Sequence, residues 1–290
     1  MAKFRWVGSG QYARRAITGP VAFLAVIAQV MPALEARAQG VEGGAPDAET
    51  SSGWIVTIGA TSLFSPQYEG SAKYGLSGLP SVSFRQPNEP EDFGAPDDSL
   101  DYTLFSTSNF KVGPVVNLRS GRSTSDDIRL AGLNNYPWTI EPGVFAEFWP
   151  VPEMLRTRVE VRHGVRGQDG FVADLSMDLV QQFGAFTLSC GPRLSLADNR
   201  TMQQEFGVSP LASFRNGLVP PFNARGGVKS IGYGIGLSYD WSEQWRTTVF
   251  HRYDRLVGDA GASPITTRFG SRDQLTFGLG LSYAFRLNAI

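Results

Sequence analysis

The sequence predicts an all-β protein: a transmembrane, antiparallel, up-and-down β-barrel of about 12 strands, with about 10 as the fallback. From Ile231 to Trp241, large apolar and aromatic side chains alternate with glycine, serine and one aspartate. Residues 275–285 repeat this alternation and end on Phe285. Alternating segments of about ten residues, separated by turns, are typical of strands that cross an outer membrane. One face of each strand then meets lipid, and the other faces the lumen.

The first 38 residues have the composition of a secretory signal peptide. Four Lys and Arg residues precede a mostly apolar run at 17–31, and Ala36-Arg37-Ala38 offers a small-x-small cleavage site. The alternative is an N-terminal membrane anchor. However, Thr18-Gly19-Pro20 interrupts the apolar run, which is also shorter than the roughly 20 residues of a spanning helix. We therefore expect residues 1–38 to direct export and to be removed.

Residues 39–52 are expected to be a flexible periplasmic linker. They are rich in Gly, Ala, Asp and Glu and contain almost no large apolar side chain, and such segments cannot bury enough surface to fold. The barrel is expected to span residues 53–285 as one domain. Residues 286–290 are expected to form a short C-terminal extension.

A period of two residues marks eleven strands in the barrel. They are read at 54–64, 77–85, 100–107, 110–119, 138–149, 154–165, 171–181, 185–196, 227–241, 245–256 and 274–285. A bacterial single-chain barrel has an even number of strands, so one strand is missed or one is falsely assigned. The doubtful region is residues 65–110, where five prolines blur the boundaries because proline cannot donate to a strand pairing.

The connections between the expected strands alternate in length. The short ones are 150–153, 182–184 and 242–244, and the long ones are 120–137, 197–226 and 258–273. Outer-membrane barrels have short periplasmic turns and longer extracellular loops. This asymmetry sets the expected orientation in the membrane.

The content of charged residues, cysteine and glycine argues against several other classes of protein. Residues 1–38 hold 5 of the 26 basic and 1 of the 27 acidic side chains, so the remainder has a net charge near −5, and no basic surplus suggests nucleic-acid binding. Cys190, the single cysteine, cannot form an intramolecular disulfide, and we interpret it as a small apolar residue on a strand. No cofactor is expected, since Gly232, Gly234 and Gly236 lie within a strand rather than in a phosphate-binding loop.

Charged residues fall on the inward face of two consecutive strands. Counting by two from the apolar positions places inside the barrel Arg156, Arg158, Glu160 and Arg162, followed by Asp174, Ser176 and Asp178. If the two strands form a hairpin, a basic column lies beside an acidic one, and pairs of opposite charge help to fix the register. The lumen is then either packed with ion pairs, as in small barrels filled by side chains, or a narrow polar passage whose charges select solutes.

Aromatic residues gather at the strand ends. They are Trp54, Trp138, Trp149, Tyr239, Trp241, Trp245 and Tyr283. Amphipathic rings favour the headgroup level of a membrane, so these residues predict girdles at both edges of the lipid-facing band.

We do not expect an enzyme. His163 and His251 are the two histidines and lie on outward-facing positions, whereas a hydrolase needs a nucleophile and a base oriented by a third group. Asp97-Asp98 and Asp126-Asp127 could bind a hard cation such as Ca²⁺. Neither pair has the spaced ligands of a calcium loop, so we interpret both as solvated acids in turns and expect no metal site.

Six short motifs, in order and at fitting spacing, make the chain resemble the MipA/OmpV family of Gram-negative outer-membrane proteins nearly end to end. The motifs are Pro66-Gln67-Tyr68-Glu69-Gly70-Ser71, Gly121-Arg122-Ser123-Thr124-Ser125-Asp126-Asp127 before Leu130-Ala131-Gly132-Leu133, Phe206-Gly207-Val208-Ser209-Pro210, Gly226-Gly227-Val228-Lys229-Ser230, Arg255-Leu256-Val257-Gly258-Asp259-Ala260 with Ser263-Pro264, and Gly280-Leu281-Ser282-Tyr283-Ala284-Phe285. Each is weak alone, and the series of six is specific.

The resemblance implies a scaffold in the cell outer membrane that links this membrane to enzymes of peptidoglycan synthesis and turnover. Its partners would be a lytic transglycosylase and a murein synthase, besides outer-membrane lipid and lipopolysaccharide. The barrel-assembly machinery would read a signal in the last strand, formed by Thr276, Gly278, Leu281, Tyr283 and Phe285. Relatives tend to stop at the terminal aromatic residue, whereas this chain continues to Ile290.

Two other functions stay open at the level of sequence. One is a channel for small polar solutes through the charged lumen. The other is a surface adhesin or stress-response barrel that acts through its long loops. Partner contacts of either kind would be made by loops and turns with no chemistry of their own, so the strand pattern does not discriminate between them.

Overall fold

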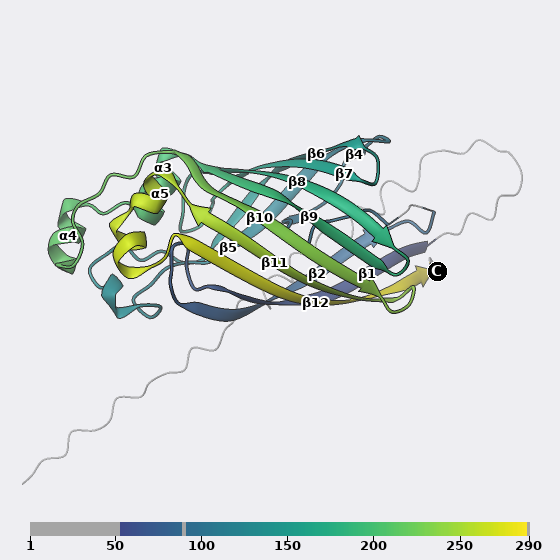
Figure 1. Ribbon diagram of the computed structural model, residues 1–290, viewed down its shortest axis with the longest axis horizontal. Coiled ribbons are helices and arrows are strands. Elements are labelled where there is room, and N and C mark those ends of the chain that lie inside the picture. The colour runs from purple at the N-terminus through teal and green to yellow at the C-terminus, as the bar shows by residue number, and fades with distance from the viewer. Residues whose placement is uncertain (1–52, 89–90, 289–290) are drawn as a thin grey trace, which may run out of the picture. The chain divides into compact units, whose positions relative to one another are not determined.

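The computed structural model describes residues 53–88 and 91–288. The expected signal peptide and linker, residues 1–52, lie outside the described residues. Twelve strands form one antiparallel sheet that curls into a nearly closed barrel, so the predicted fold class is confirmed (Figure 1). The strands are β1 (Gly53–Pro66), β2 (Tyr74–Arg85), β3 (Leu100–Asp101), β4 (Phe105–Ser106), β5 (Phe110–Arg119), β6 (Thr139–Val151), β7 (Leu155–His163), β8 (Phe171–Phe183), β9 (Phe186–Ala197), β10 (Gly227–Asp240), β11 (Trp245–Leu256) and β12 (Asp273–Asn288).

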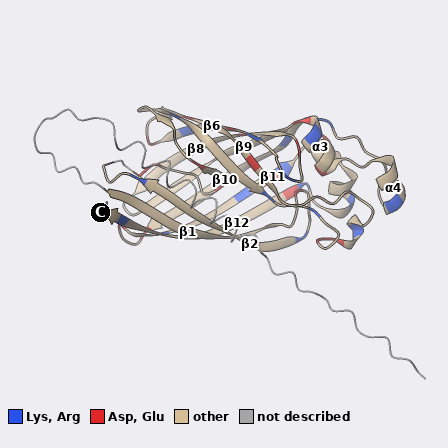
Figure 2. Cartoon of the chain, turned by 180° about the vertical axis from the view of Figure 1, so that it is seen from behind, with Lys and Arg blue, Asp and Glu red and all other residues tan. Residues whose placement is uncertain are grey.

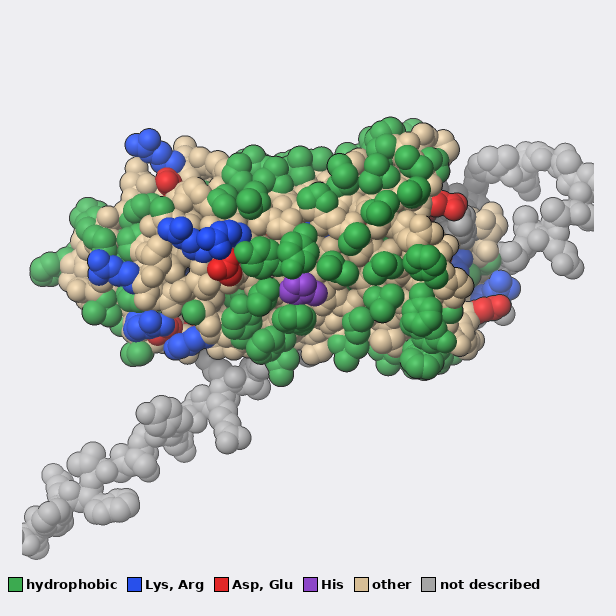
Figure 3. Space-filling model, in the orientation of Figure 1, with side chains coloured by type: hydrophobic (Ala, Val, Ile, Leu, Met, Phe, Trp, Pro, Cys, Tyr) green, Lys and Arg blue, Asp and Glu red, His purple; other side chains and the backbone are tan. Residues whose placement is uncertain are grey.

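The alternation of side chains continues around the wall. In β10, Ile231 and Ile235 are 49% and 44% exposed, whereas Gly234 and Gly236 are buried. Figure 3 shows apolar side chains spread over the middle of the visible face. Because the large residues point away from the barrel and the small residues line its inside, the apolar face of each strand is the lipid-facing one.

β2 and β3 lie at the two ends of the sheet, and no pairing joins them among the described residues. β3 and β4 both pair with β5, at Val115–Val116 and at Lys111–Val112. β3 and β4 are therefore two short pieces of one interrupted strand in the barrel wall, the strand expected at 100–107. Residues 86–88 and 91–99 of the proline-rich region contain no further strand.

The two ends of the barrel differ in the length of their connections. We define the loop end by residues 67–73, 120–138, 164–170, 198–226 and 257–272, and the turn end by residues 107–109, 152–154, 184–185 and 241–244. At the turn end, Gly184 takes a φ of 59° between β8 and β9, a conformation that glycine adopts without a steric cost. By the rule for outer-membrane barrels, the turn end faces the periplasm and the loop end faces outward.

Short helices occupy the loop end (Figure 1). They are η1 (Ile128–Leu130), α3 (Asn199–Phe206), α4 (Pro210–Asn216), α5 (Gly258–Ala262) and η2 (Ile265–Phe269). Asp198 caps α3 by accepting from the Thr201 N–H, and Ser209 caps α4 by accepting from the Ala212 N–H, so each side chain satisfies one of the free donors of a helix start. None of the helices in the described part of the chain is long and apolar enough to cross a membrane.

The long loops pack against one another instead of extending freely. One cluster of buried side chains unites Tyr68, Leu130, Val208 and Ile265 from four different loops. A second cluster surrounds Phe206. We call these two clusters the cap, because their burial gives the loop end an apolar core of its own.

Two expectations about strand ends are wrong. Trp149 is 7% exposed, and its Nε1 donates to Glu147 Oε1 over 2.8 Å, so this ring faces the lumen rather than the lipid girdle. Residues 286–288 continue β12 by pairing with residues 53–55, so the barrel does not end at Phe285. Their pairing with β1 supplies the backbone partners that a free extension would lack.

Candidate functional site: an ion-paired lumen

The β7–β8 hairpin places its charged residues on the lumen side. Arg156 pairs in register with Asp178, and Glu160 pairs with Asp174. Arg156, Arg158, Glu160, Arg162 and Asp178 are buried, and Asp174 is partly buried. The columns are therefore adjacent: Arg156 and Asp178 attract one another as cross-strand neighbours, and Arg162 binds both Glu160 and Asp174, which carry like charges.

Arg156 forms the centre of this network. Its side chain is 0% exposed and binds Asp178 from β8 at 2.9 Å and Asp98 at 2.7 Å. Both guanidinium Nη atoms donate to the two Asp98 carboxylate oxygens, over 2.7 and 2.9 Å. Such a bidentate pair is geometrically specific as well as strong, so it fixes the backbone around Asp98 against β7.

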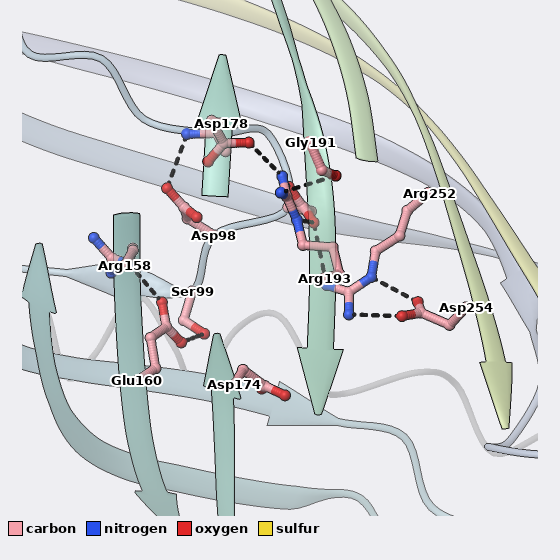
Figure 4. A network of polar contacts seen from close by, with 12 residues as sticks. Asp98, Ser99, Arg158, Glu160, Asp174, Asp178, Gly191, Arg193, Arg252 and Asp254 are labelled. Atoms are coloured by element: carbon pink, nitrogen blue, oxygen red, sulfur yellow. Dashed lines mark hydrogen bonds and ion pairs between the residues drawn. The ribbon is translucent and has the colours of Figure 1, made fainter. Parts of the chain in front are cut away.

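Asp97 occupies the opposite side of the same turn. It accepts from Arg193 of β9 over 2.8 and 2.9 Å and from Arg252 of β11 over 3.1 Å. Arg252 also binds Asp254 (Figure 4). The side chains of Asp97 and Asp98 are 9% and 14% exposed, so the interpretation of this pair as solvated acids is wrong.

The chain from Glu91 to Ser99, which we call the lumen segment, therefore runs inside the barrel. A turn at Ala95-Pro96-Asp97-Asp98 closes with a 3.0 Å bond from the Asp98 N–H to the Ala95 carbonyl, and proline suits the second position of such a turn. Asp92 binds Lys111 of β5 at 2.6 Å, and Phe93 packs edge-on against Trp149 of β6. The segment thus contacts several sides of the wall.

Glycines on β10 make room for this arrangement. A Cβ atom on Gly236 would lie 2.9 Å from Pro96, and one on Gly234 would lie 2.9 Å from the Arg193 guanidinium. Larger residues at these positions would displace the lumen segment or its anchor. The lumen segment therefore packs against the glycine-containing face of β10.

Arg158 connects the lumen segment to a second group of acids. It binds Asp101 at 2.6 Å and Glu160 at 2.9 Å, and it lies over the Phe145 ring at 4.1 Å from the centroid. Ser99 donates to Glu160 over 2.7 Å. Arg162 contacts Glu160, Asp174 and Glu141, so the network continues towards the loop end.

A cluster of charges lies where the barrel meets the cap, and we call it the mouth cluster. It consists of Glu69, Arg119, Glu141, Glu205 and Lys229. Burial opposes ionisation of Glu69, but Lys229 and Arg119 outweigh it and lower its pKa. Burial raises the pKa of Glu205 on α3, although the Arg119 guanidinium opposes that shift. Like the centre of the barrel, its mouth is filled by paired side chains.

Figure 2 shows charged positions on strands in the body of the barrel. A cavity of about 150 Å³ lies beside the lumen segment, lined by Thr61, Ser81, Pro96, Thr248, Phe250 and Gly280 among others. Its lining carries no charged side chain, because β1, β2 and β12 turn small residues inward here. This cavity is thus neutral and small.

Several charged residues of this network were not predicted from the sequence to lie in the lumen. Arg193 and Arg252 sit at inward positions of strands that the period had already identified, so the same count could have found them. Asp97 and Asp98 had no such signal, since they lie between strands. Only the tertiary structure brings Asp97 against arginines 96 and 155 positions away, and Asp98 against an arginine 58 positions away.

The other candidate residues lie away from the network. His163 binds Asp169 at 3.1 Å near the loop end, and His251 lies against Phe277 on the lipid side. Cys190 is a free, partly buried cysteine in β9. In the part of the chain that the structure describes, no three His, Cys, Asp or Glu side chains form a metal-binding group.

Asp127 also differs from its expectation as a solvated acid. Its side chain is 2% exposed, binds Arg129 at 2.6 Å and caps η1 through the Arg129 N–H. The hydrogen bonds from Arg129 lower the pKa of Asp127 to about 2. This carboxylate therefore stabilises the loop rather than facing solvent.

The residues of the expected assembly signal all lie in β12. Leu281, Tyr283 and Phe285 occupy outward positions, and Thr276 and Gly278 occupy inward ones, as their partners in β11 require. Tyr283 packs against Trp245 with ring centroids 4.7 Å apart. Recognition of this strand by the assembly machinery stays a proposal.

A nearly closed barrel with an apolar outer band and a charged interior defines the protein as an outer-membrane β-barrel. The chain belongs to the MltA-interacting protein MipA family, whose model matches residues 58–285.

Two solved structures illustrate more distant similarity. The KdgM porin is 14% identical, with 80% of this chain and 99% of the porin covered and a TM-score of 0.35. The COG4313 outer membrane channel from Pseudomonas putida F1 is 10% identical, with 85% of this chain and 100% of the channel covered and a TM-score of 0.37. No curated protein matches the chain in sequence.

Proposed function

We propose that the protein is a scaffold in the outer membrane that holds enzymes of peptidoglycan turnover and synthesis at the membrane's periplasmic side. The observation that carries this proposal is the filled lumen. Asp97 and Asp98 cross-link the lumen segment to three strands, and the mouth cluster and the cap lie above it. A barrel closed in this way is suited to anchoring rather than to conducting.

The family supports the identity of the partner. The family is named for interaction with MltA, and we propose a lytic transglycosylase as the first partner and a murein synthase as the second. The turn end faces the periplasm, so it is the part of the described barrel available to both. Glu153 and Glu243 lie exposed at two of its turns.

A pull-down from periplasmic extract tests the scaffold. The full-length mature protein, folded in detergent micelles, should retain a lytic transglycosylase or a murein synthase. The double variant Glu153→Lys and Glu243→Lys should retain less of it, because it reverses charge at the turn end. Retention of neither enzyme by the wild-type protein would overturn the proposal.

The matched control adds lysines at the opposite end. Ile128 and Phe214 are 76% and 85% exposed at the loop end, and Ile128→Lys with Phe214→Lys should leave retention unchanged. If this control loses the partner and the turn-end variant keeps it, the binding surface lies on the outer side and a surface adhesin becomes the better function.

The neutral cavity beside the lumen segment is the one observation that favours a channel. Planar-bilayer recording separates the two functions. The scaffold predicts a silent wild-type protein, and reproducible conductance steps would instead support a passage for small polar solutes.

A further inference from the structure

A hollow of about 640 Å³ opens at the loop end, away from the lumen network. It lies between α3, the chain that leads into β10 and the connection between β7 and β8. Its volume is within the range of about 300–1,000 Å³ that holds a drug-sized ligand. The neutral cavity of about 150 Å³ in the lumen is much smaller.

Three side-chain amides of this hollow are held in one orientation. Gln203 Oε1 accepts from the Ala224 N–H over 3.0 Å, Gln204 Oε1 accepts from the Asp169 N–H over 3.0 Å, and Asn199 Oδ1 accepts from the Gly226 N–H over 2.7 Å. An amide carries one carbonyl acceptor and one NH₂ donor. With these carbonyls engaged by the backbone, the NH₂ groups of Gln204 and Asn199 have no hydrogen-bond partner among the described residues and are left to meet a ligand, whereas that of Gln203 lies against Gly207.

The charged groups of the lining follow the same pattern. Arg200 and Arg225 bring two guanidinium groups, which are donors only. Asp169 is the single carboxylate among the residues that line the hollow, and it is already engaged by Arg200 at 3.0 Å and by His163 at 3.1 Å. The hollow therefore presents mostly donors and a net positive charge.

We propose that this hollow binds an anionic, acceptor-rich sugar, one that carries carboxylate or phosphate groups. Guanidinium groups pair bidentately with such anions, and the fixed amide donors match the ring and hydroxyl oxygens of a sugar. Among the amide side chains of the described lining, a cationic ligand would find one carbonyl that no backbone N–H engages, that of Asn223. The proposal is independent of the scaffold function, because the hollow lies at the end of the barrel opposite the periplasmic turns.

Two sources present this chemistry at the outer surface. One is a free acidic oligosaccharide, and the other is the phosphorylated core of neighbouring lipopolysaccharide. Titration calorimetry with the full-length mature protein in micelles distinguishes them. The first pair of probes is trigalacturonate and neutral maltotriose, and the second is rough lipopolysaccharide with and without its core phosphates.

We expect at least one anionic probe to bind at least tenfold more tightly than the counterpart that lacks its sugar carboxylates or core phosphates. Gln204→Glu is the sharpest variant, since it keeps an oxygen for the Asp169 N–H and replaces the NH₂ donor with a negative oxygen. This variant should weaken binding at least tenfold. The double variant Arg200→Gln with Arg225→Gln should also weaken binding at least tenfold. Arg215→Gln on α4, exposed outside the hollow, should leave binding unchanged.

Heat-modifiable migration on a gel shows whether each variant still folds as a barrel. Equal binding of charged and uncharged probes would overturn the proposal, as would an unchanged affinity in the folded Gln204→Glu variant. Failure of both anionic probes to bind at millimolar concentration would also overturn it. Binding of the phosphorylated lipopolysaccharide alone would support the proposal and assign the source to the membrane.

Discussion

At the scale of single residues, the protein depends on buried charges that have more than one partner. Arg156 is enclosed by Asp98 and Asp178, and Arg193 by Asp97 and Asp178. Burying a charge is costly unless it is paired and hydrogen-bonded. Removal of one member therefore leaves its partners as uncompensated buried charges.

Arg156→Met tests this dependence. It should lower the free energy of unfolding by about 3–5 kcal/mol, because Asp98 and Asp178 each lose a buried partner. Urea unfolding in micelles, followed by tryptophan fluorescence, measures the change. Arg255→Met is the matched control, because Arg255 and Asp273 form a solvent-exposed pair, and exposed ion pairs add little to stability. Equal losses in both variants would contradict the role of burial.

Asp127 gives the loop end a dependence on pH. Its pKa of about 2 lies below the ordinary value of 3.8, so its stabilising contribution is complete above about pH 4 and is lost as the pH falls towards 2. Asp127→Asn keeps an oxygen for the cap but loses the ion pair with Arg129, and it should lower the free energy of unfolding at pH 7 by about 1 kcal/mol. Urea unfolding at several pH values should show the two proteins converging between pH 4 and pH 2. A constant difference over that range would contradict the assignment.

At the scale of secondary-structure elements, the unusual feature is the open edge between β2 and β3. β1 has partners on both sides, in β2 and β12, whereas within the described residues β1 is the one strand that pairs with β2. An unpaired strand edge exposes N–H and C=O groups, which lipid cannot satisfy. Pro80 in the middle of β2 fits this position, because proline in sheets is confined to edges and bulges.

Hydrogen exchange should reveal this edge. We expect the β2 amides that point away from β1 to exchange faster than the amides of β10, which pairs with both β9 and β11. Residue-resolved exchange in micelles measures the difference. Uniform protection along β2 would mean that another strand pairs with its free edge.

At the scale of the whole molecule, one segment closes the barrel from within. Asp97 and Asp98 hold the middle of the lumen segment to β7, β9 and β11, while the contacts Glu91–Arg246, Asp92–Lys111 and Ser99–Glu160 hold its two ends. The arginines that bind them also have other acids as partners, namely Asp178 and Asp254. The middle of the segment can therefore lose these two anchors while the wall keeps its own ion pairs.

The double variant Asp97→Asn and Asp98→Asn should release the segment. We expect intermittent conductance steps in planar bilayers from this variant and none from the wild-type protein. Asp273→Asn, outside the lumen, is the control and should stay silent. A silent double variant that still migrates as a folded barrel would show that the carboxylates do not hold the lumen closed.

Most strands of the barrel wall could be predicted from the sequence. Much of what fills the lumen could not. The two-residue period identified every strand position, including the interrupted one at 100–107, because lipid on one side and a packed lumen on the other impose opposite polarity on neighbouring residues. The same period assigned Arg156 and Arg158 to the inside. It misplaced Trp149, since an aromatic ring at a strand end suits either a lipid girdle or a filled lumen.

The sequence by itself determined the barrel, its orientation by loop length and the family resemblance, since these depend on local alternation and on spacing along the chain. The tertiary structure alone decided what fills the barrel. Asp97 and Asp98 hold the lumen segment in place only because they pair with arginines on strands that are distant in the sequence. Likewise, the donors of the surface hollow become oriented only when α3 packs against the chain leading into β10. Long-range ion pairs and oriented amides form between segments that only the fold brings together. A local sequence pattern therefore does not predict them.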